Sequence, residues 1–369
     1  MSFPLFQRPG TVVFLDDDPD YLEMLALVLP RHWRVLLFLR PSDCINYLQQ
    51  EPPFWEADSW NQQQLVDQWR DGKPLIPQIL SYWARYTERY ALARVCVVDY
   101  SMPAMDGLQA LAELVDWPGS RVLLTGQADE QVAVRAFNRG LIDQFIAKQT
   151  PDISRRLIDA VELLLKTPNA RHALTWRATL TPEQNALLRQ PSIGRELEEF
   201  TAARWVEYVV IGAPFGILGM DASGAVGWLQ LETGQGRKAL AELAEIEGLP
   251  APLAEDIRQG RRLADLELRQ ALGHANPVQV ATAFPIGQDG ELVGALFTIG
   301  PEHGPHADNG YSSWLMRQDF SPTLTTRITA PRRNLMLGPA FSDRPDMAGR
   351  RPSPVISNGS PSWRIANTF

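Results

Sequence analysis

Short hydrophobic runs that end in polar side chains recur along the N-terminal part of the chain. Thr11–Leu15 runs into three aspartates, and the run that contains Val97 and Val98 ends at Asp99. Two further runs, at 121–124 and 144–147, end in Thr125 and Lys148. Runs of this length predict buried parallel strands, and the amphipathic stretch 20–29 predicts a helix after the first of them. The pattern indicates an α/β fold with a parallel sheet.

The carboxyl ends of parallel strands meet along one edge of an open sheet. This edge would bring together Asp16, Asp17, Asp99, Thr125 and Lys148. Each of these side chains, taken alone, is also compatible with an ordinary strand end. Their joint occurrence in this order favours a functional crevice.

The chemistry of this set points to phosphoryl transfer. Two carboxylates about 4 Å apart repel by roughly 4 kcal/mol, so the acidic cluster favours a divalent cation. Oxygen ligands with free positions for water and phosphate suit Mg²⁺. Asp99 would act as the nucleophile, while the metal and Lys148 neutralise the transferring oxygens.

Residues 10–166 resemble the receiver domain of bacterial two-component response regulators. The resemblance rests on Asp16-Asp17 before Asp18-Pro19, on Asp99 followed by Met102-Pro103 and Met105-Asp106-Gly107, on Thr125-Gly126, and on Lys148 with Phe145 three residues before it. It implies a doubly wound (βα)5 parallel-sheet fold and phosphorylation by a sensor histidine kinase or a phosphotransfer protein.

The resemblance also implies a role for each site residue. Asp17, Asp99 and the backbone carbonyl of Ser101 would hold Mg²⁺, with Asp16 acting through water. Asp99 would be the phosphoacceptor, and Thr125 and Lys148 would bind the phosphoryl group. Phe145 would rotate inward when Thr125 moves.

The sequence departs from the family pattern at two places. Gln149 and Thr150 separate Lys148 from Pro151, where the family usually has a proline directly after the lysine. The connection at about 51–93 is longer than the family needs and predicts an inserted helical element. We expect an irregular entry, a short helix at 62–70 and a longer helix at 76–90. Three tyrosines share one face of the longer helix at four-residue spacing: Tyr82, Tyr86 and Tyr90. We favour packing of this face within the protein over docking of a partner.

A second, α+β domain is expected at 205–302, after a helical linker at 167–204. In the linker, Thr181 with Pro182 and Gln184 predicts a helix start, and a further helix is expected at 194–208. Hairpins are predicted at 217–229 and 278–299. Helices are expected between these hairpins at 237–245, 253–259 and 263–272. This layout resembles a PAS-type sensory or dimerisation domain. Residues 303–369 are expected to be mostly irregular, with disorder at 331–369.

Composition limits the expected partners and location of the protein. The chain has 369 residues and a net charge of −8, which argues against a broadly basic nucleic-acid surface. Six arginines and two aspartates give 331–369 a net charge of +4, and a solubilising tail is the favoured interpretation. Two cysteines exclude a disulfide framework, and no apolar run reaches the roughly 20 residues that span a bilayer. We expect a cytoplasmic protein with no membrane partner.

Two function classes remain open at this point. In the first, phosphorylation of Asp99 alters protein interaction or dimerisation through the C-terminal module. In the second, that module senses a small molecule and the receiver is modulatory or vestigial. A transcriptional regulator would need a DNA-binding surface, and no clear reading helix is present. No dedicated enzyme is expected beyond Mg²⁺-dependent chemistry at Asp99. Gln127 is a candidate for orienting a hydrolytic water, and His274 is expected to be a solvated loop residue.

Overall fold

The computed structural model describes residues 3–126, 130–167, 169–273, 277–288 and 290–318. Gln127 and His274 therefore lie outside the described residues, as does the tail from 319 onward. All helices and strands given below lie within residues 3–318.

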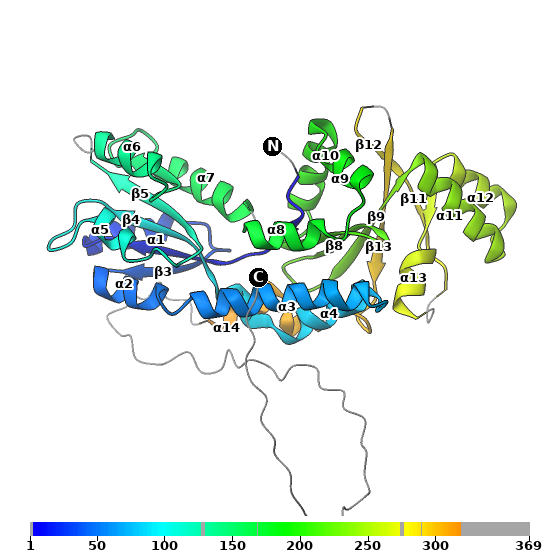
Figure 1. Ribbon diagram of the computed structural model, residues 1–369, viewed down its shortest axis with the longest axis horizontal. Helices are drawn as coiled ribbons and strands as arrows, with labels where there is room; N and C mark the ends of the chain where they lie inside the picture. Colours follow the sequence, from blue (N-terminus) through cyan, green and yellow to red (C-terminus); the bar gives the residue numbers. More distant parts are fainter. Residues whose placement is uncertain (1–2, 127–129, 168, 274–276, 289, 319–369) are drawn as a thin grey trace, which may run out of the picture. The chain divides into compact units, whose positions relative to one another are not determined.

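A five-stranded parallel sheet is the first architectural unit (Figure 1). Its strand order is β3-β2-β4-β5-β6. Strand β2, the first of the five in the chain, therefore lies between β3 and β4. Four of its five strands are nearly continuous hydrophobic runs, as expected for a sheet covered on both faces. The strands are β2 (Thr11–Leu15), β3 (Arg34–Phe38), β4 (Ala93–Asp99), β5 (Ser120–Thr125) and β6 (Gln144–Ala147).

Helices cover both faces of this sheet, so the predicted doubly wound fold is confirmed. One face packs on hydrophobic side chains of α1 and α7. The other packs on those of α2, α5 and α6. The helices are α1 (Pro19–Val28), α2 (Pro41–Leu48), α5 (Gly107–Ala112), α6 (Glu130–Asn138) and α7 (Ile153–Lys166).

The insertion between α2 and β4 is helical from its first residues, so the expected irregular entry is wrong. Pro52 lies in the first turn of α3 (Pro52–Arg70), where a proline lacks only an amide hydrogen that the helix does not use. The longer helix also ends earlier than expected, because α4 (Leu75–Arg85) gives way to the 3-10 turn η1 (Thr87–Ala91).

The insertion packs into the hydrophobic core of the second sheet. Tyr82 and Tyr90 are buried in the cluster that also contains Trp228 and Leu229, and Tyr86 packs against that cluster. This burial supports the packing interpretation of the tyrosine stripe.

A six-stranded antiparallel sheet forms the second unit, in the order β1-β7-β8-β9-β13-β12. The predicted hairpins are present as β8–β9 and β12–β13. Two of its strands were not predicted: the short β1, which precedes the parallel sheet in the chain, and β7, with which it pairs. The strands are β1 (Phe6–Gln7), β7 (Glu207–Gly212), β8 (Phe215–Met220), β9 (Val226–Thr233), β12 (Phe284–Ile286) and β13 (Leu292–Ile299).

Helices surround this sheet, and two of them have other bounds than the sequence predicts. The predicted helix at 194–208 ends at Ala202, and Tyr208 instead belongs to β7. The predicted helix at 263–272 begins as a short strand, β10, that pairs with β11. The remaining elements are α8 (Ala170–Arg177), α9 (Pro182–Leu188), α10 (Pro191–Ala202), α11 (Gly234–Ile246), α12 (Ala251–Arg258), β10 (Arg262–Ala264), α13 (Leu266–Leu272), β11 (Val280–Thr282), η3 (Ala307–Asn309) and α14 (Tyr311–Arg317).

The predicted domain boundaries stay predictions, although element ends lie near them. Helix α7 ends at Lys166, and β7 begins at Glu207. The segment after 303, expected to be mostly irregular, contains η3 and α14 within its described part.

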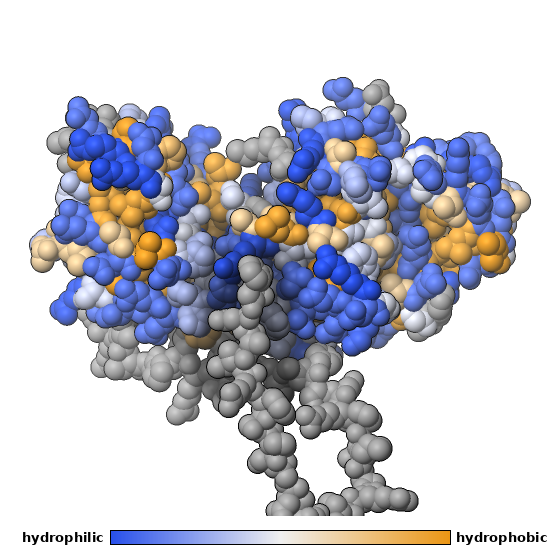
Figure 2. All heavy atoms as spheres, in the orientation of Figure 1, coloured by the Kyte–Doolittle hydropathy of each residue, from blue (hydrophilic) through white to orange (hydrophobic). Residues whose placement is uncertain are grey.

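Hydrophobic side chains are exposed at scattered points. Figure 2 shows separate hydrophobic patches on the face drawn, between larger hydrophilic areas. Exposed hydrophobic side chains lie on several different elements, among them Leu27 of α1, Leu174 of α8 and Ile246 of α11. Single exposed hydrophobic residues are normal on protein surfaces. They do not mark a site, so the polar strand ends are the better candidate.

Candidate functional site

The predicted site residues converge at the carboxyl edge of the parallel sheet. Asp99 is the last residue of β4, and its neighbour in β5 is Leu124, next to Thr125. Asp16 and Asp17 follow β2 directly, and Lys148 follows β6. Strands β2 and β5 flank β4 on its two sides, so side chains from four strands face one crevice.

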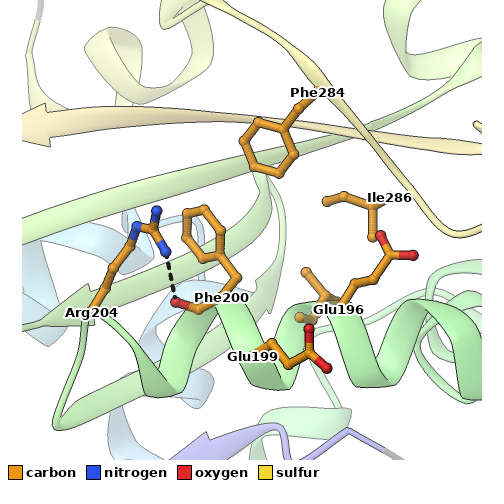
Figure 3. A pocket seen from close by; sticks show the side chains of 7 residues that line it. Glu196, Glu199, Phe200, Arg204, Phe284 and Ile286 are labelled. Atoms are coloured by element: carbon orange, nitrogen blue, oxygen red, sulfur yellow. Dashed lines mark hydrogen bonds between the residues drawn. The ribbon is translucent and has the colours of Figure 1, made fainter.

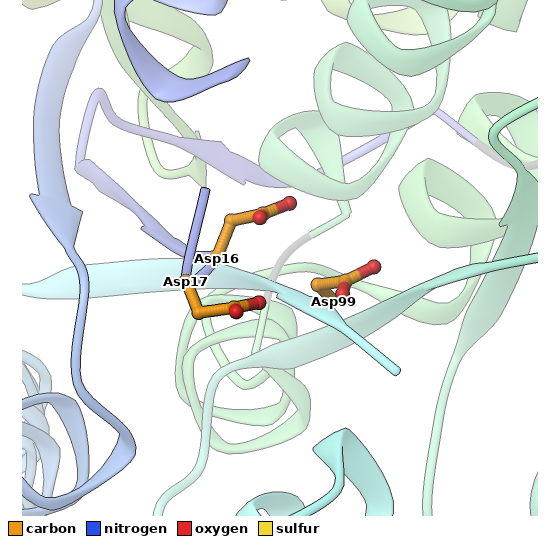
Figure 4. Close-up of side chains that lie close together, drawn as sticks. All are labelled: Asp16, Asp17 and Asp99. Atoms are coloured by element: carbon orange, nitrogen blue, oxygen red, sulfur yellow. The ribbon is translucent and has the colours of Figure 1, made fainter. Parts of the chain in front are cut away.

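Three carboxylates form the acidic centre of this crevice. One oxygen from each of Asp16, Asp17 and Asp99 lies within 4.8 Å of the others. Figure 4 shows the three side chains extending to the same side of the view from the segment after β2 and from the end of β4. Asp16 and Asp99 are buried, whereas Asp17 is exposed. An all-oxygen set with one solvent-facing member fits a hard cation that keeps bound water, such as Mg²⁺.

Lys148 bridges two of these carboxylates. Its Nζ lies 2.8 Å from Asp16 Oδ2 and 2.7 Å from Asp99 Oδ1. Partial burial alone would lower the pKa of Lys148, but its bonds to the two carboxylates raise that pKa above its ordinary value. The lysine therefore carries a positive charge at neutral pH, directly beside Asp99.

Thr125 supplies a hydroxyl that is poised for a further ligand. Its side chain is fully buried, and Oγ1 has no hydrogen-bond partner among the described residues. A buried polar atom without a partner is unfavourable by about 1–3 kcal/mol. An oxygen-rich group bound at Asp99 would satisfy it, so this hydroxyl fits the predicted site.

Phe145 lies on β6, which is separated by β5 from β4, the strand that carries Asp99. It is paired with Leu123 of β5 in the sheet and packs, half-buried, against the core below α5 and α6. Its predicted rotation stays a prediction.

The loop after Asp99 is held by its own backbone. The Ser101 amide donates to Asp99 Oδ2 over 3.1 Å, which fixes the carboxylate. Gly107 packs so closely that an added Cβ would lie 2.2 Å from the Asp99 carbonyl oxygen. Asp106 then starts α5 with a capping box that includes Gln109. The local structure of this loop therefore explains both Gly107 and Asp106. The predicted role of the Ser101 carbonyl stays a prediction.

The sequence pattern does not indicate one neighbour of the site, Tyr21. The aromatic ring of Tyr21, in the first turn of α1, has its centroid 4.6 Å from Lys148 Nζ. Its position five residues after Asp16 gives no periodic signal for this contact. Only the fold of the loop between β2 and α1 brings the ring to the lysine.

A separate groove lies on the second sheet, between α10 and β12. Figure 3 shows the Phe200 and Phe284 rings close to each other, with Arg204 beside Phe200. The two phenyl rings stack at 5.5 Å, and the cavity has a volume of about 320 Å³. The carboxylates of Glu196 and Glu199 also line it.

No helix in the described part of the chain is both long enough and apolar enough to cross a membrane.

Comparison with known proteins places the fold. No protein-family model matches the chain, and no curated protein matches its sequence. The solved structure of the response regulator LqsR from Legionella pneumophila is similar over 88% of this chain and 100% of that chain, with 21% identity and a TM-score of 0.67. A receiver domain protein from Clostridium thermocellum matches over 42% of this chain and 94% of its own, with 16% identity and a TM-score of 0.29.

The similarity to LqsR extends over both sheets, and at 21% identity it shows a shared fold. Together with the doubly wound parallel sheet, it confirms the predicted resemblance at the level of architecture. The chain thus has the fold of a response regulator, with a parallel-sheet domain of the receiver fold and a second domain built on an antiparallel sheet.

Proposed function

We propose that this protein is a response regulator controlled by phosphorylation of Asp99. The observation that carries the proposal is the surroundings of that carboxylate. Lys148 Nζ lies 2.7 Å from Asp99 Oδ1, and the carboxylates of Asp16 and Asp17 lie within 4.8 Å. A buried carboxylate between a fixed ammonium and a cation-binding cluster has what a phosphoryl acceptor needs.

The phosphodonor would be a phosphohistidine of a sensor histidine kinase or a phosphotransfer protein. An Asp99 carboxylate oxygen attacks the phosphorus, the new P–O bond forms, and the P–N bond to the imidazole breaks. The electron pair of the broken bond stays on the imidazole nitrogen, and Asp99 becomes an acyl phosphate. No oxidant or further co-reactant is needed.

The protein's own groups would stabilise the charge on the transferring oxygens. Lys148 already holds an ammonium beside the acceptor, and Thr125 offers a hydroxyl without a partner. Mg²⁺, bound by Asp17, Asp99 and the Ser101 carbonyl with Asp16 acting through water, would supply further positive charge at the same oxygens.

The output would act through the C-terminal module, by changing protein interaction or dimerisation. Contacts from β4 support such a connection. Arg94, on the same strand as Asp99, donates to the carbonyls of Arg8 (2.6 Å) and Thr167 (2.8 Å). Arg8 directly follows β1, a strand of the second sheet, and Thr167 directly follows α7. The switch would begin with Thr125 and Phe145, and a partner would have to bind the two receiver states with different affinity.

Small phosphodonors provide a direct test of this proposal. Purified protein is incubated with phosphoramidate and Mg²⁺, and its intact mass is measured by mass spectrometry. The wild type should gain one phosphoryl group, and Asp99→Asn should gain none. Asp106→Asn, in the same loop, is the matched control and should behave as wild type. Equal modification of the wild type and Asp99→Asn would refute the proposal. Light scattering on the same samples reports whether phosphorylation changes the oligomeric state.

The groove between α10 and β12 favours a second candidate function, small-molecule sensing by the C-terminal module. Its volume of about 320 Å³ and its two phenyl rings suit a small aromatic or aliphatic ligand. Native mass spectrometry of freshly purified protein tests this candidate. A bound small molecule that is lost in Phe200→Ala would support it, and protein that carries no ligand from a native source would speak against it.

Both cysteines, Cys44 and Cys96, are buried and free. Free thiols are compatible with the proposed location in a reducing cytoplasm.

A further inference from the structure

Tyr21 contributes a second buried hydroxyl to the crevice around Asp99. Its Oη is buried and has no hydrogen-bond partner among the described residues, which is also the situation of Thr125 Oγ1. Two hydroxyls without partners at one site indicate a missing oxygen-rich ligand, because buried donors are normally satisfied.

The position of Tyr21 is fixed from two sides. Asp18 caps α1, and its Oδ1 accepts hydrogen bonds from the amides of Asp20 (2.9 Å) and Tyr21 (3.2 Å). The ring then lies against Lys148, with Nζ 4.6 Å from the ring centroid, which is within the range of a cation–π contact. The same ammonium contacts Asp99 at 2.7 Å. The ring therefore borders the group that would receive the phosphoryl oxygens.

The hydroxyl of Tyr21 is a neutral donor at physiological pH. Burial raises its pKa above the ordinary value, the charge of Lys148 lowers it, and the charges of Asp16 and Asp99 raise it. A neutral phenol beside a phosphoryl group donates a hydrogen bond and adds no negative charge.

We propose that Tyr21 is a phosphoryl-binding residue: its hydroxyl donates to an oxygen of the group on Asp99, while its ring positions the Lys148 ammonium. This inference rests on the proposed function, because it requires a phosphoryl group at Asp99. The sequence pattern assigns no role to Tyr21.

Beryllofluoride, which mimics the phosphoryl group on an aspartate, is the probe. Its affinity in the presence of Mg²⁺ is measured by ¹⁹F NMR titration for the wild type, Tyr21→Phe, Tyr21→Leu, Asp99→Asn and Tyr47→Phe. Tyr21→Phe removes only the hydroxyl and should bind about tenfold more weakly, the effect of one hydrogen bond to a charged group. Tyr21→Leu also removes the ring and should bind more weakly still. Tyr47→Phe, a receiver tyrosine whose ring packs on Phe38, is the control and should match the wild type.

Thermal unfolding of the free proteins separates binding from folding. Tyr21→Phe should be at least as stable as the wild type, because the change removes a buried hydroxyl that has no partner. Lower affinity together with unchanged stability supports the proposal. Wild-type affinity in Tyr21→Phe would overturn it while leaving the proposed function intact. Failure of the wild type to bind beryllofluoride, or equal binding by Asp99→Asn, would overturn both.

Discussion

Replacing Asp58 by asparagine should strongly destabilise the protein, because Asp58 is the centre of a buried polar cluster. It accepts two hydrogen bonds from Arg8, at 2.8 and 2.9 Å, and one from Gln62 at 3.1 Å. Tyr82 also donates to it, and His172 Nε2 lies 3.0 Å away. These partners come from the N-terminal segment, α3, α4 and α8. One carboxylate therefore joins four segments of the chain.

The size of the effect follows from the burial of Arg8. Its side chain is only 2% exposed, so an asparagine at 58 would leave a buried guanidinium without its counter-charge. Breaking a buried ion pair on one side destabilises proteins by about 3–5 kcal/mol. Total unfolding free energies are about 5–15 kcal/mol, so this loss is a large part of the whole.

The pH dependence of stability should change as well. Burial alone would raise the pKa of Asp58, but the charge of Arg8 and the hydrogen bonds from His172 and Arg8 lower it far below its ordinary value of 3.8. The native state therefore binds fewer protons than the unfolded state at low pH. The contribution of Asp58 is present above about pH 4 and is lost as the pH falls below it. Asp58→Asn should lack this part of the acid sensitivity.

Urea unfolding monitored by circular dichroism measures both effects. Asp67→Asn, on the same helix, is the matched control, because its ion pair with Arg70 is about half exposed and exposed pairs contribute about 0–1 kcal/mol. A loss below about 1 kcal/mol in Asp58→Asn at pH 7, or a loss no larger than that of the control, would refute the reasoning.

Three further predictions follow from the site and the second sheet. Gly107→Ala should abolish phosphorylation by phosphoramidate, because the added Cβ would lie 2.2 Å from the Asp99 carbonyl oxygen; normal mass gain would contradict this. Removal of Mg²⁺ with EDTA should prevent the same mass gain, and excess Mg²⁺ should restore it; unchanged modification in EDTA would contradict the assigned cation site. Burial raises the pKa of Glu232 from 4.5 to about 7, so the native state binds more protons in this range and stability should fall by about 3 kcal/mol as the pH rises through it. Urea titrations at pH 5 and 8 should show this fall in the wild type and a smaller one in Glu232→Gln, and equal falls would contradict it.

The parallel sheet was predictable because its strands carry a local signal. Four of the five, β2, β4, β5 and β6, are short hydrophobic runs with a polar residue at or just after the carboxyl end, whereas β3 ends at Phe38 without one. The topology then brings Asp16, Asp99 and Lys148 together. The distances confirm that these side chains meet. Their roles in phosphoryl transfer stay predictions.

The second sheet was harder to predict because part of it comes from distant sequence. Strand β1 has two residues, too few for any periodic pattern. It pairs with β7, and the whole parallel-sheet domain lies between these two strands in the sequence. The start of α3 was misjudged for a local reason: Pro52 and Pro53 break a helix interior but are tolerated in a first turn. Tyr21 was missed because its contact with Lys148 depends on tertiary structure alone.

The most direct measurement is the chemical location of the phosphoryl group. Wild-type protein is phosphorylated with phosphoramidate and Mg²⁺, reduced with borohydride, digested, and sequenced by mass spectrometry. Borohydride converts an aspartyl phosphate to homoserine, so the account predicts homoserine at position 99 and aspartate at 16, 17 and 106. Homoserine at another position, or an unreduced Asp99 in protein that has gained phosphate, would contradict the central claim.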